Sequence, residues 1–106
     1  MHYYMVSYDI CDEKRVKKVF KLLKNFGRPI QYSVFCCRLS DENLEIVKSR
    51  LISLIDSKVD QVLFFRLRET TEGKVAKNAF SIMGKPVSPE VPDYLGFHLT
   101  SQENTN

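Results

Sequence analysis

Several features common in secreted and membrane-spanning proteins are missing from this sequence. Its apolar runs are a few residues long, far short of the roughly 20 residues that a bilayer-spanning helix needs. Asp9 interrupts the first of these runs before the apolar centre of a secretory signal could form. The 106 residues fit one domain. We therefore expect a cytoplasmic protein with no membrane segment.

Cysteine is also scarce, and its placement argues against a disulfide framework and against a zinc site. Cys11, Cys36 and Cys37 are odd in number, and two of them are adjacent, which is a poor basis for a disulfide framework. There is no C-x-x-C pair, and only His2 and His98 could add imidazole ligands. A zinc site is therefore not expected, and the three thiols are interpreted as small buried or half-buried side chains.

The net charge of +3 is small, but the charge is concentrated in one segment. Between Asp12 and Phe26, six basic residues against two acidic ones give a net charge of +4. Apolar residues recur there at helical spacing from Val16 to Phe26, and the lysines fall on the opposite side. Asp12 is expected to cap the start of this helix and Gly27 its end, as a left-handed residue.

The rest of the chain alternates between strand and helix patterns. The expected elements are a strand at Tyr3–Ile10, one continuous strand at Ile30–Leu39, a helix that Ser40 caps and that extends to Ile55, a strand at Val62–Leu67, and a short strand at Ala79–Met83. Pro86, Pro89 and Pro92 indicate an extended arm. We therefore divide the chain into a domain at 1–83 and an arm with a polar tail at 84–106.

This order predicts an α+β sandwich in which both helices cover one face of a single sheet. The other face would be bare, with aromatic residues available to point that way. These are Tyr8, Phe35, Phe64 and Phe65. A partner subunit is the natural cover for such a face.

Several short motifs, in order, resemble the CRISPR-associated Cas2 family. They are Tyr8-Asp9-Ile10, the basic run from Lys14 to Val19, Gln31-Tyr32-Ser33-Val34-Phe35 with Cys37, Leu39-Ser40, and Leu54-Ile55-Asp56. The resemblance covers roughly Met1 to Leu67. It implies a ferredoxin-like βαββαβ sandwich, a two-fold homodimer, and an additional short C-terminal strand that reaches the partner's sheet. It also implies two strands within Ile30–Leu39, where the residue pattern alone indicates one. Cys36 departs from the acidic residue usual in the family.

Asp9 is the candidate metal ligand and catalytic residue. A lone carboxylate at a strand end is usually a structural cap, but a two-fold axis brings each residue near its own copy. Two Asp9 carboxylates with waters would suit Mg²⁺, and the resemblance implies that metal-binding role. It also marks Tyr8, Ser33 and Phe35 as recurrent site positions. Ser33 is expected to hydrogen-bond a phosphate, whereas Phe35 either stacks on nucleic acid or, as we favour, packs in the interface.

The basic residues have two readings, a solvated helix surface or a phosphate-binding face. No acidic residue follows Glu13 until Asp41, so the pairs that normally neutralise such a face are missing. We therefore favour phosphate binding, and the dominance of lysine suits backbone contact. The expected nucleic-acid-binding residues are Lys14, Arg15, Lys17, Lys18, Lys21 and Arg28.

Three functions follow as hypotheses. The first, which the resemblance favours, is the dimeric DNA-binding centre of the spacer-acquisition complex in CRISPR adaptation, bridging copies of a Cas1-type integrase. The second is a Mg²⁺-dependent endonuclease acting on RNA or duplex DNA. The third is a toxin-type metal-dependent ribonuclease on the same scaffold. An RNA-recognition module is disfavoured because its basic-glycine-aromatic signature is absent from Ile30–Leu39.

Overall fold

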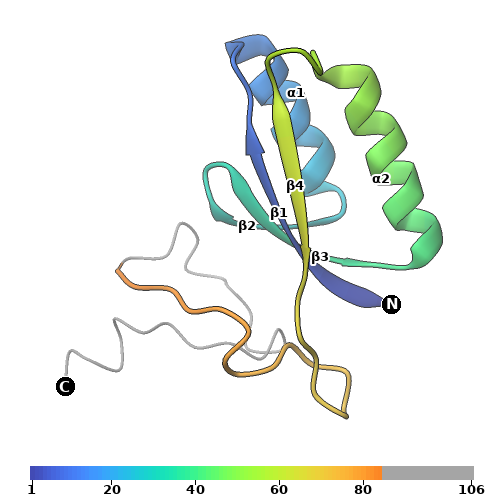
Figure 1. Ribbon diagram of the computed structural model, residues 1–106, viewed down its shortest axis with the longest axis vertical. Coiled ribbons are helices and arrows are strands. Elements are labelled where there is room, and N and C mark those ends of the chain that lie inside the picture. The colour runs from blue at the N-terminus through green and yellow to red at the C-terminus, as the bar shows by residue number, and fades with distance from the viewer. Residues whose placement is uncertain (85–106) are drawn as a thin grey trace.

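The computed structural model describes residues 1–84, which form one antiparallel sheet with both helices on one face (Figure 1). The elements are β1 (His2–Asp9), α1 (Glu13–Lys24), β2 (Gly27–Gln31), β3 (Val34–Leu39), α2 (Asp41–Leu54) and β4 (Gln61–Arg66). The strand order is β2-β3-β1-β4. This arrangement confirms the expected α+β, ferredoxin-like βαββαβ fold. Within this part of the chain, neither helix is long and apolar enough to cross a bilayer.

Both helices begin where the sequence predicts. The Asp12 carboxylate accepts a hydrogen bond from the Arg15 amide, and the Ser40 hydroxyl accepts one from the Asn43 amide. Each side chain thereby satisfies one of the free N–H groups of a first helical turn. The apolar sides of the helices then pack on the sheet, with Val19 and Leu23 of α1 fully buried.

The central strand β1 carries the core on the helix side. It pairs with β3 from His2 opposite Leu39 to Ser7 opposite Val34, and with β4 on its other edge. Its side chains alternate between the faces of the sheet. The buried strand residues on the helix side are Tyr4, Val6, Tyr8, Phe35, Cys37 and Leu39.

The expectation that Tyr8, Phe35 and Phe64 point to the bare face is wrong. All three belong to the core between sheet and helices, where Phe35 is 0% exposed. The Phe35 ring centroid lies 5.2 Å from that of Phe20 in an edge-on contact. Of the four predicted aromatics only Phe65 lies outside this core, and it is 51% exposed.

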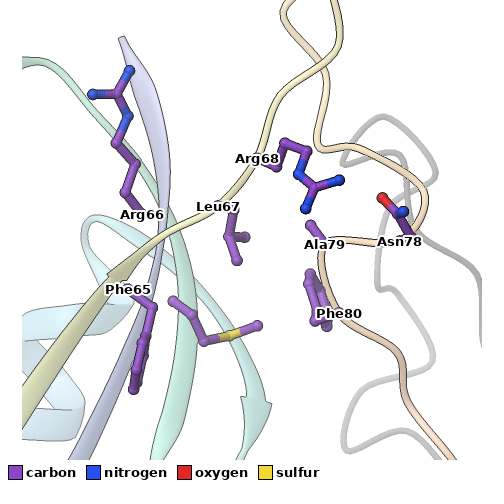
Figure 2. A pocket seen from close by; sticks show the side chains of 8 residues that line it. Phe65, Arg66, Leu67, Arg68, Asn78, Ala79 and Phe80 are labelled. Atoms are coloured by element: carbon purple, nitrogen blue, oxygen red, sulfur yellow. The ribbon is translucent and has the colours of Figure 1, made fainter.

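The second face of the sheet is partly covered by the chain itself. A second buried cluster contains Tyr3, Ile30, Cys36, Leu67 and Val75, and side chains between Ala79 and Ile82 pack against it. A cavity of about 530 Å³ lies between the end of β4 and this returning segment (Figure 2). The predicted bare face is therefore partly covered, with Phe65 at the cavity wall.

The short strand predicted at Ala79–Met83 is not among the strands that residues 1–84 form. Ile82 alone has bridge geometry there. The predicted arm at 84–106 lies, beyond Gly84, outside the described residues.

The region Ile30–Leu39 contains a hairpin, as the resemblance implies and the residue pattern did not indicate. A turn at Tyr32 and Ser33 separates β2 from β3. Two-residue hairpin turns usually need positive φ angles and therefore glycine or asparagine. No non-glycine residue of the described chain has a positive φ. The turn at Tyr32 and Ser33 therefore needs neither glycine nor asparagine, and the sequence contains no residue that would indicate it.

The prediction that Gly27 is a left-handed helix cap is also wrong. Helix α1 ends at Lys24, and Asn25 caps it in a right-handed conformation (φ −75°). Gly27 instead opens β2 opposite Cys37. A Cβ atom placed on Gly27 would lie 2.9 Å from the Cys37 Cα and closer still to the Cys36 carbonyl oxygen and the Cys37 Sγ. Glycine is therefore required at position 27 because β3 lies too close to leave room for a Cβ atom, and not because of a positive φ angle.

Gly27→Ala is therefore expected to destabilise the fold by about 1–3 kcal/mol, because the added methyl group meets backbone atoms that cannot move aside cheaply. Urea unfolding followed by circular dichroism measures the change. Ser49→Ala, at an exposed position on α2, is the control and should stay within about 0.5 kcal/mol of the wild type. Equal stability of the two variants would contradict the close approach.

Two of the three cysteines are buried as predicted, and Cys11 is exposed. Burial raises the pKa of the Cys36 thiol to about 12. Burial, together with the neighbouring Cys36, raises the pKa of Cys37 to about 12 as well. Both thiols thus stay protonated at neutral pH and act as small apolar core residues.

Candidate functional site

The carboxyl end of β1 holds the predicted site residues. Asp9 is the last residue of the strand, is exposed, and lies opposite Gln61 of β4. Strand alternation directs it to the face opposite the Tyr8 ring. Its carboxylate is therefore presented to solvent at the edge of the face that α1 and α2 leave open.

Tyr8 and Ser33 are brought together by the β2–β3 turn. The Tyr8 amide donates to the Ser33 carbonyl oxygen at 3.0 Å, and the Tyr8 hydroxyl donates to the Tyr32 carbonyl oxygen at 2.7 Å. Burial raises the pKa of the Tyr8 phenol above its ordinary value. The Tyr8 phenol is therefore neutral at physiological pH, and its hydrogen bond holds the β2–β3 turn against β1. Beside it, Tyr32 is 86% exposed.

The four predicted site residues therefore divide into two groups. Asp9 is exposed and Ser33 half-buried at the same end of the sheet, where both could meet a ligand. The rings of Tyr8 and Phe35 are buried under the helices, with centroids 6.4 Å apart. Phe35 consequently belongs to the core of its own chain, and neither stacking on nucleic acid nor packing in an interface is open to it.

The donor set at Asp9 limits what metal it could hold. Residues 1–84 contain no group of three or more histidine, cysteine or acidic side chains placed to share a metal ion. A single exposed carboxylate per chain is compatible with Mg²⁺, which takes one or two carboxylates and retains several waters. The residues therefore fit Mg²⁺ when two chains each contribute Asp9, and fit poorly within one chain.

The outer surface of α1 presents lysines, as the helical spacing predicts. Lys14, Lys17, Lys18 and Lys21 are all exposed. Arg28 does not join them, although the sequence places it only a few residues beyond the helix. It lies on β2 directly opposite Cys36, and residues directly opposite share a face of the sheet. Cys36 belongs to the second cluster, so Arg28 projects from the face away from α1.

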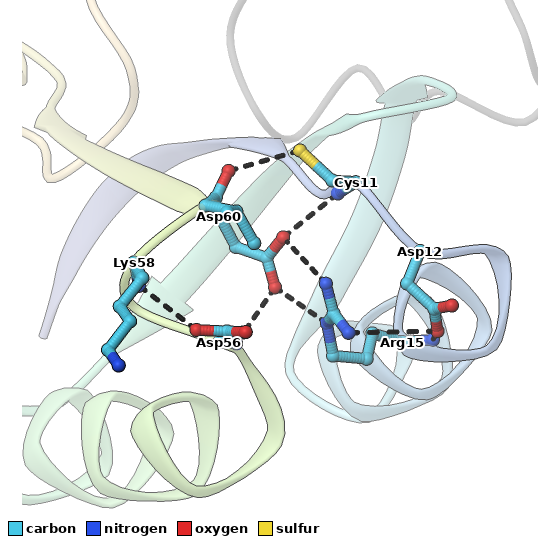
Figure 3. A network of polar contacts seen from close by, with 7 residues as sticks. Cys11, Asp12, Arg15, Asp56, Lys58 and Asp60 are labelled. Atoms are coloured by element: carbon cyan, nitrogen blue, oxygen red, sulfur yellow. Dashed lines mark hydrogen bonds and ion pairs between the residues drawn. The ribbon is translucent and has the colours of Figure 1, made fainter.

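Arg15, another of the expected nucleic-acid-binding residues, is engaged elsewhere, because its side chain forms an ion pair with a buried aspartate. Its Nε donates to Asp60 Oδ2 at 2.8 Å and a terminal nitrogen donates to Oδ1 at 3.2 Å (Figure 3). The Asp60 side chain is 0% exposed. It also accepts the amides of Cys11 at 2.9 Å and Asp56 at 2.8 Å. The sequence analysis did not predict this network.

The network holds Asp60 ionised. The hydrogen bond from Arg15 keeps the pKa of Asp60 well below its ordinary range, outweighing the opposing effect of burial, and the amides of Cys11 and Asp56 act in the same direction as Arg15. Asp60 raises the pKa of Arg15 in return. The pair is a fixed ion pair at every physiological pH.

Because the pKa of Asp60 is lowered in the folded protein, its contribution to stability is present above the ordinary aspartate pKa of about 3.9 and is lost as the pH falls below it. Wild type should therefore lose more unfolding free energy between pH 4 and pH 2 than Asp60→Asn does. Urea unfolding at a series of pH values measures both slopes. Glu45→Gln, at an exposed position on α2, should keep the wild-type slope, and equal slopes in all three proteins would contradict this role.

Comparison with known proteins gives a consistent result. The family model described as CRISPR associated protein Cas2 matches residues 1–75. A CRISPR-associated endoribonuclease Cas2 of Synechocystis sp. is 35% identical over 92 residues, which are 87% of this chain and 95% of that protein. Another, from Thermodesulfovibrio yellowstonii, is 44% identical over 60% of this chain and 70% of its own length. The crystal structure of Streptococcus pyogenes Cas2 matches with a TM-score of 0.60 at 34% identity, over 62% of this chain and 86% of that one.

Proposed function

Because the chain belongs to the CRISPR-associated Cas2 family, we propose that it is the dimeric, DNA-binding centre of a spacer-acquisition complex with a Cas1-type integrase. The observation that carries the proposal is the exposed row of lysines on the outer surface of α1. Its members are Lys14, Lys17, Lys18 and Lys21, and we call it the lysine row.

Glu13 is the only acidic residue on α1, and it forms no ion pair with the lysine row. In the described part of the chain the ion pairs join His2 to Glu69 and Arg15 to Asp12 and Asp60, and none of them involves a lysine. Unpaired like charges on one helix repel each other, and phosphate groups are the simplest partner that relieves the repulsion. Lysine makes point-charge contacts to phosphates without reading bases. The lysine row therefore supports binding of the protein along duplex DNA of any base sequence.

A second copy of the chain supplies what one copy lacks. The face away from the helices leaves Leu63 at 42% and Phe65 at 51% exposure on neighbouring positions of β4, a surface that a partner would cover. Two-fold pairing there brings two Asp9 carboxylates toward one axis and places two lysine rows on one particle.

The protein is accordingly expected to be a dimer at micromolar concentration, with twice the 12.4 kDa mass of one chain. Light scattering measures the mass. Phe65→Asp should shift the protein toward monomer, because a charge on this face would lose its solvation on pairing. Leu63→Ala, a smaller loss of the same surface, serves as the milder comparison. A wild-type monomer across this range would contradict the proposed dimer.

Mg²⁺-dependent endonuclease activity is the second candidate function, and the exposed Asp9 at the end of β1 favours it. The relatives reported above are named endoribonucleases. Mg²⁺ held between two Asp9 carboxylates would supply Lewis-acid polarisation of a phosphate. The Asp9 carboxylate would bind the metal, and the Ser33 hydroxyl would orient the phosphate at the strand end. We place this activity second to the architectural role.

The proposed function is tested by purifying the tagged chain from its own cells after nuclease digestion. Recovery of a Cas1-type integrase supports the adaptation role. Recovery of a small antitoxin instead supports the toxin-type ribonuclease, and so would an antitoxin gene directly upstream. An integrase that is lost on nuclease digestion would show association through DNA alone, which contradicts a direct bridge.

A further inference from the structure

The network around Asp60 joins two segments that lie far apart in the sequence, residues 11–15 and residues 56–60. Figure 3 shows the Asp60 carboxylate between the loop after β1, the first turn of α1 and the loop before β4. Four N–H groups converge on its two oxygens, two from Arg15 and one each from the Cys11 and Asp56 backbones. Its buried charge is thereby fully paired. We call this arrangement the Asp60 clasp.

The clasp fixes the loop that follows Asp9 at two points. The Cys11 amide donates to Asp60 Oδ1 at 2.9 Å, and the Cys11 thiol donates to the Val59 carbonyl oxygen at 3.1 Å. Only Ile10 separates Cys11 from Asp9. The direction in which Asp9 leaves the end of β1 is therefore set by where Cys11 is held.

The same clasp sets the start of the basic helix. Asp12 caps α1 by accepting the Arg15 amide at 3.0 Å, while the Arg15 side chain reaches Asp60. One buried carboxylate thus locates both the strand end that carries Asp9 and the helix turn that carries Lys14. The Asp60 side chain is buried and the Arg15 guanidinium is engaged with it, so any effect of this pair on chemistry must act through Asp9 and Lys14.

From this geometry we propose that Arg15 and Asp60 are positioning residues, which hold Asp9 at a fixed place relative to the lysine row. The proposal rests on the function proposed above for Asp9 and for the lysines. With the clasp intact, a phosphate bound along α1 lies at a set position from the Asp9 carboxylate. With the clasp loosened, the lysine row remains, because α1 stays packed through Val19 and Leu23. Asp9 then keeps only its pairing with Gln61 at the end of β1 and is held less firmly.

Arg15→Lys is the decisive variant, because it keeps the charge and removes the two-pronged contact to Asp60. Arg50→Lys makes the same chemical change at an exposed position on α2 and is the matched control. Duplex affinity and its salt dependence should be unchanged in both. In Arg15→Lys alone, amide hydrogen exchange at Cys11 should accelerate, and Mg²⁺-dependent kcat should fall about 10- to 100-fold, as for other residues that orient a metal ligand.

Binding of Mn²⁺ can be measured without enzyme turnover, and it distinguishes failure of the positioning role from failure of the proposed metal role of Asp9. Mn²⁺ added alone should broaden the amide resonances of Asp9 and Ile10 in the wild type, and more weakly in Arg15→Lys. If Arg15→Lys shows the same broadening, hydrogen exchange and kcat as the wild type, the positioning role is overturned and the proposed function remains intact. Faster exchange at Cys11 with unchanged kcat and broadening would also overturn it, since the clasp would then be structural only. A wild type that neither cleaves nor binds Mn²⁺ at Asp9 would contradict the metal role of Asp9, and the positioning role with it.

Discussion

Asp9→Ala is expected to abolish Mg²⁺-dependent cleavage while leaving the dimer and its affinity for duplex DNA nearly intact. The side chain is exposed at the end of β1, so its loss removes a metal ligand without opening a cavity in the core. Cleavage of labelled RNA and duplex DNA with and without EDTA measures the effect. Light scattering and a salt titration of DNA affinity on the same sample verify that the assembly survives.

Asp41→Ala removes an exposed carboxylate at the first residue of α2 and is the control for a general loss of negative charge. Cleavage at the wild-type rate by Asp9→Ala would exclude the catalytic role, and failure to fold would show that Asp9 is a structural residue. Spacer acquisition in cells that carry this variant answers a separate question. Its survival would assign the chain an architectural role in adaptation, with hydrolysis dispensable.

The local features that the sequence predicted correctly are those that depend on neighbouring residues. Asp12 and Ser40 cap their helices because each lies beside the amide it satisfies. The lysine row is exposed because residues three and four apart share a side of a helix. The order of the elements followed from these patterns, and the resemblance supplied the hairpin that the alternation of Ile30–Leu39 conceals.

The features that the sequence could not predict depend on tertiary contacts. Alternation separates Tyr8 from Asp9, but it does not say which face meets the helices when both faces carry apolar residues, as Tyr3 and Tyr4 show. The assignment of Phe35 to an open face was wrong for this reason. Asp60 resembles Asp56 in residue type and surroundings, and only the approach of Arg15 from 45 positions earlier in the chain distinguishes the buried one.

Arg28 illustrates the same limit for charge. Its proximity to α1 in the sequence suggested one continuous basic patch, but the pairing of β2 with β3 places it on the opposite face. The predicted nucleic-acid-binding set is thereby reduced to the lysines of α1, which makes the set testable as one surface.

Replacing Lys14, Lys17 and Lys18 with glutamine is expected to weaken duplex binding similarly for every DNA sequence tested. Removing one lysine–phosphate interaction should flatten the plot of log affinity against log salt by roughly 0.9, and in a dimer every substitution acts twice. Stability should change little, because all three side chains are exposed and glutamine is nearly as good a helix former as lysine. Fluorescence anisotropy over a range of salt concentrations gives both affinity and slope.

The matched control removes the same charge elsewhere, with Lys58, Lys74 and Lys77 replaced by glutamine at exposed positions outside α1. If both triple variants weaken binding equally, net charge alone attracts the DNA and the lysine row has no special place in the complex. If the α1 variant binds with the wild-type slope, the row is a solvated surface. A reduced slope in the α1 variant alone assigns the phosphate interactions to this helix, because the two variants carry the same net charge and differ only in where it was removed.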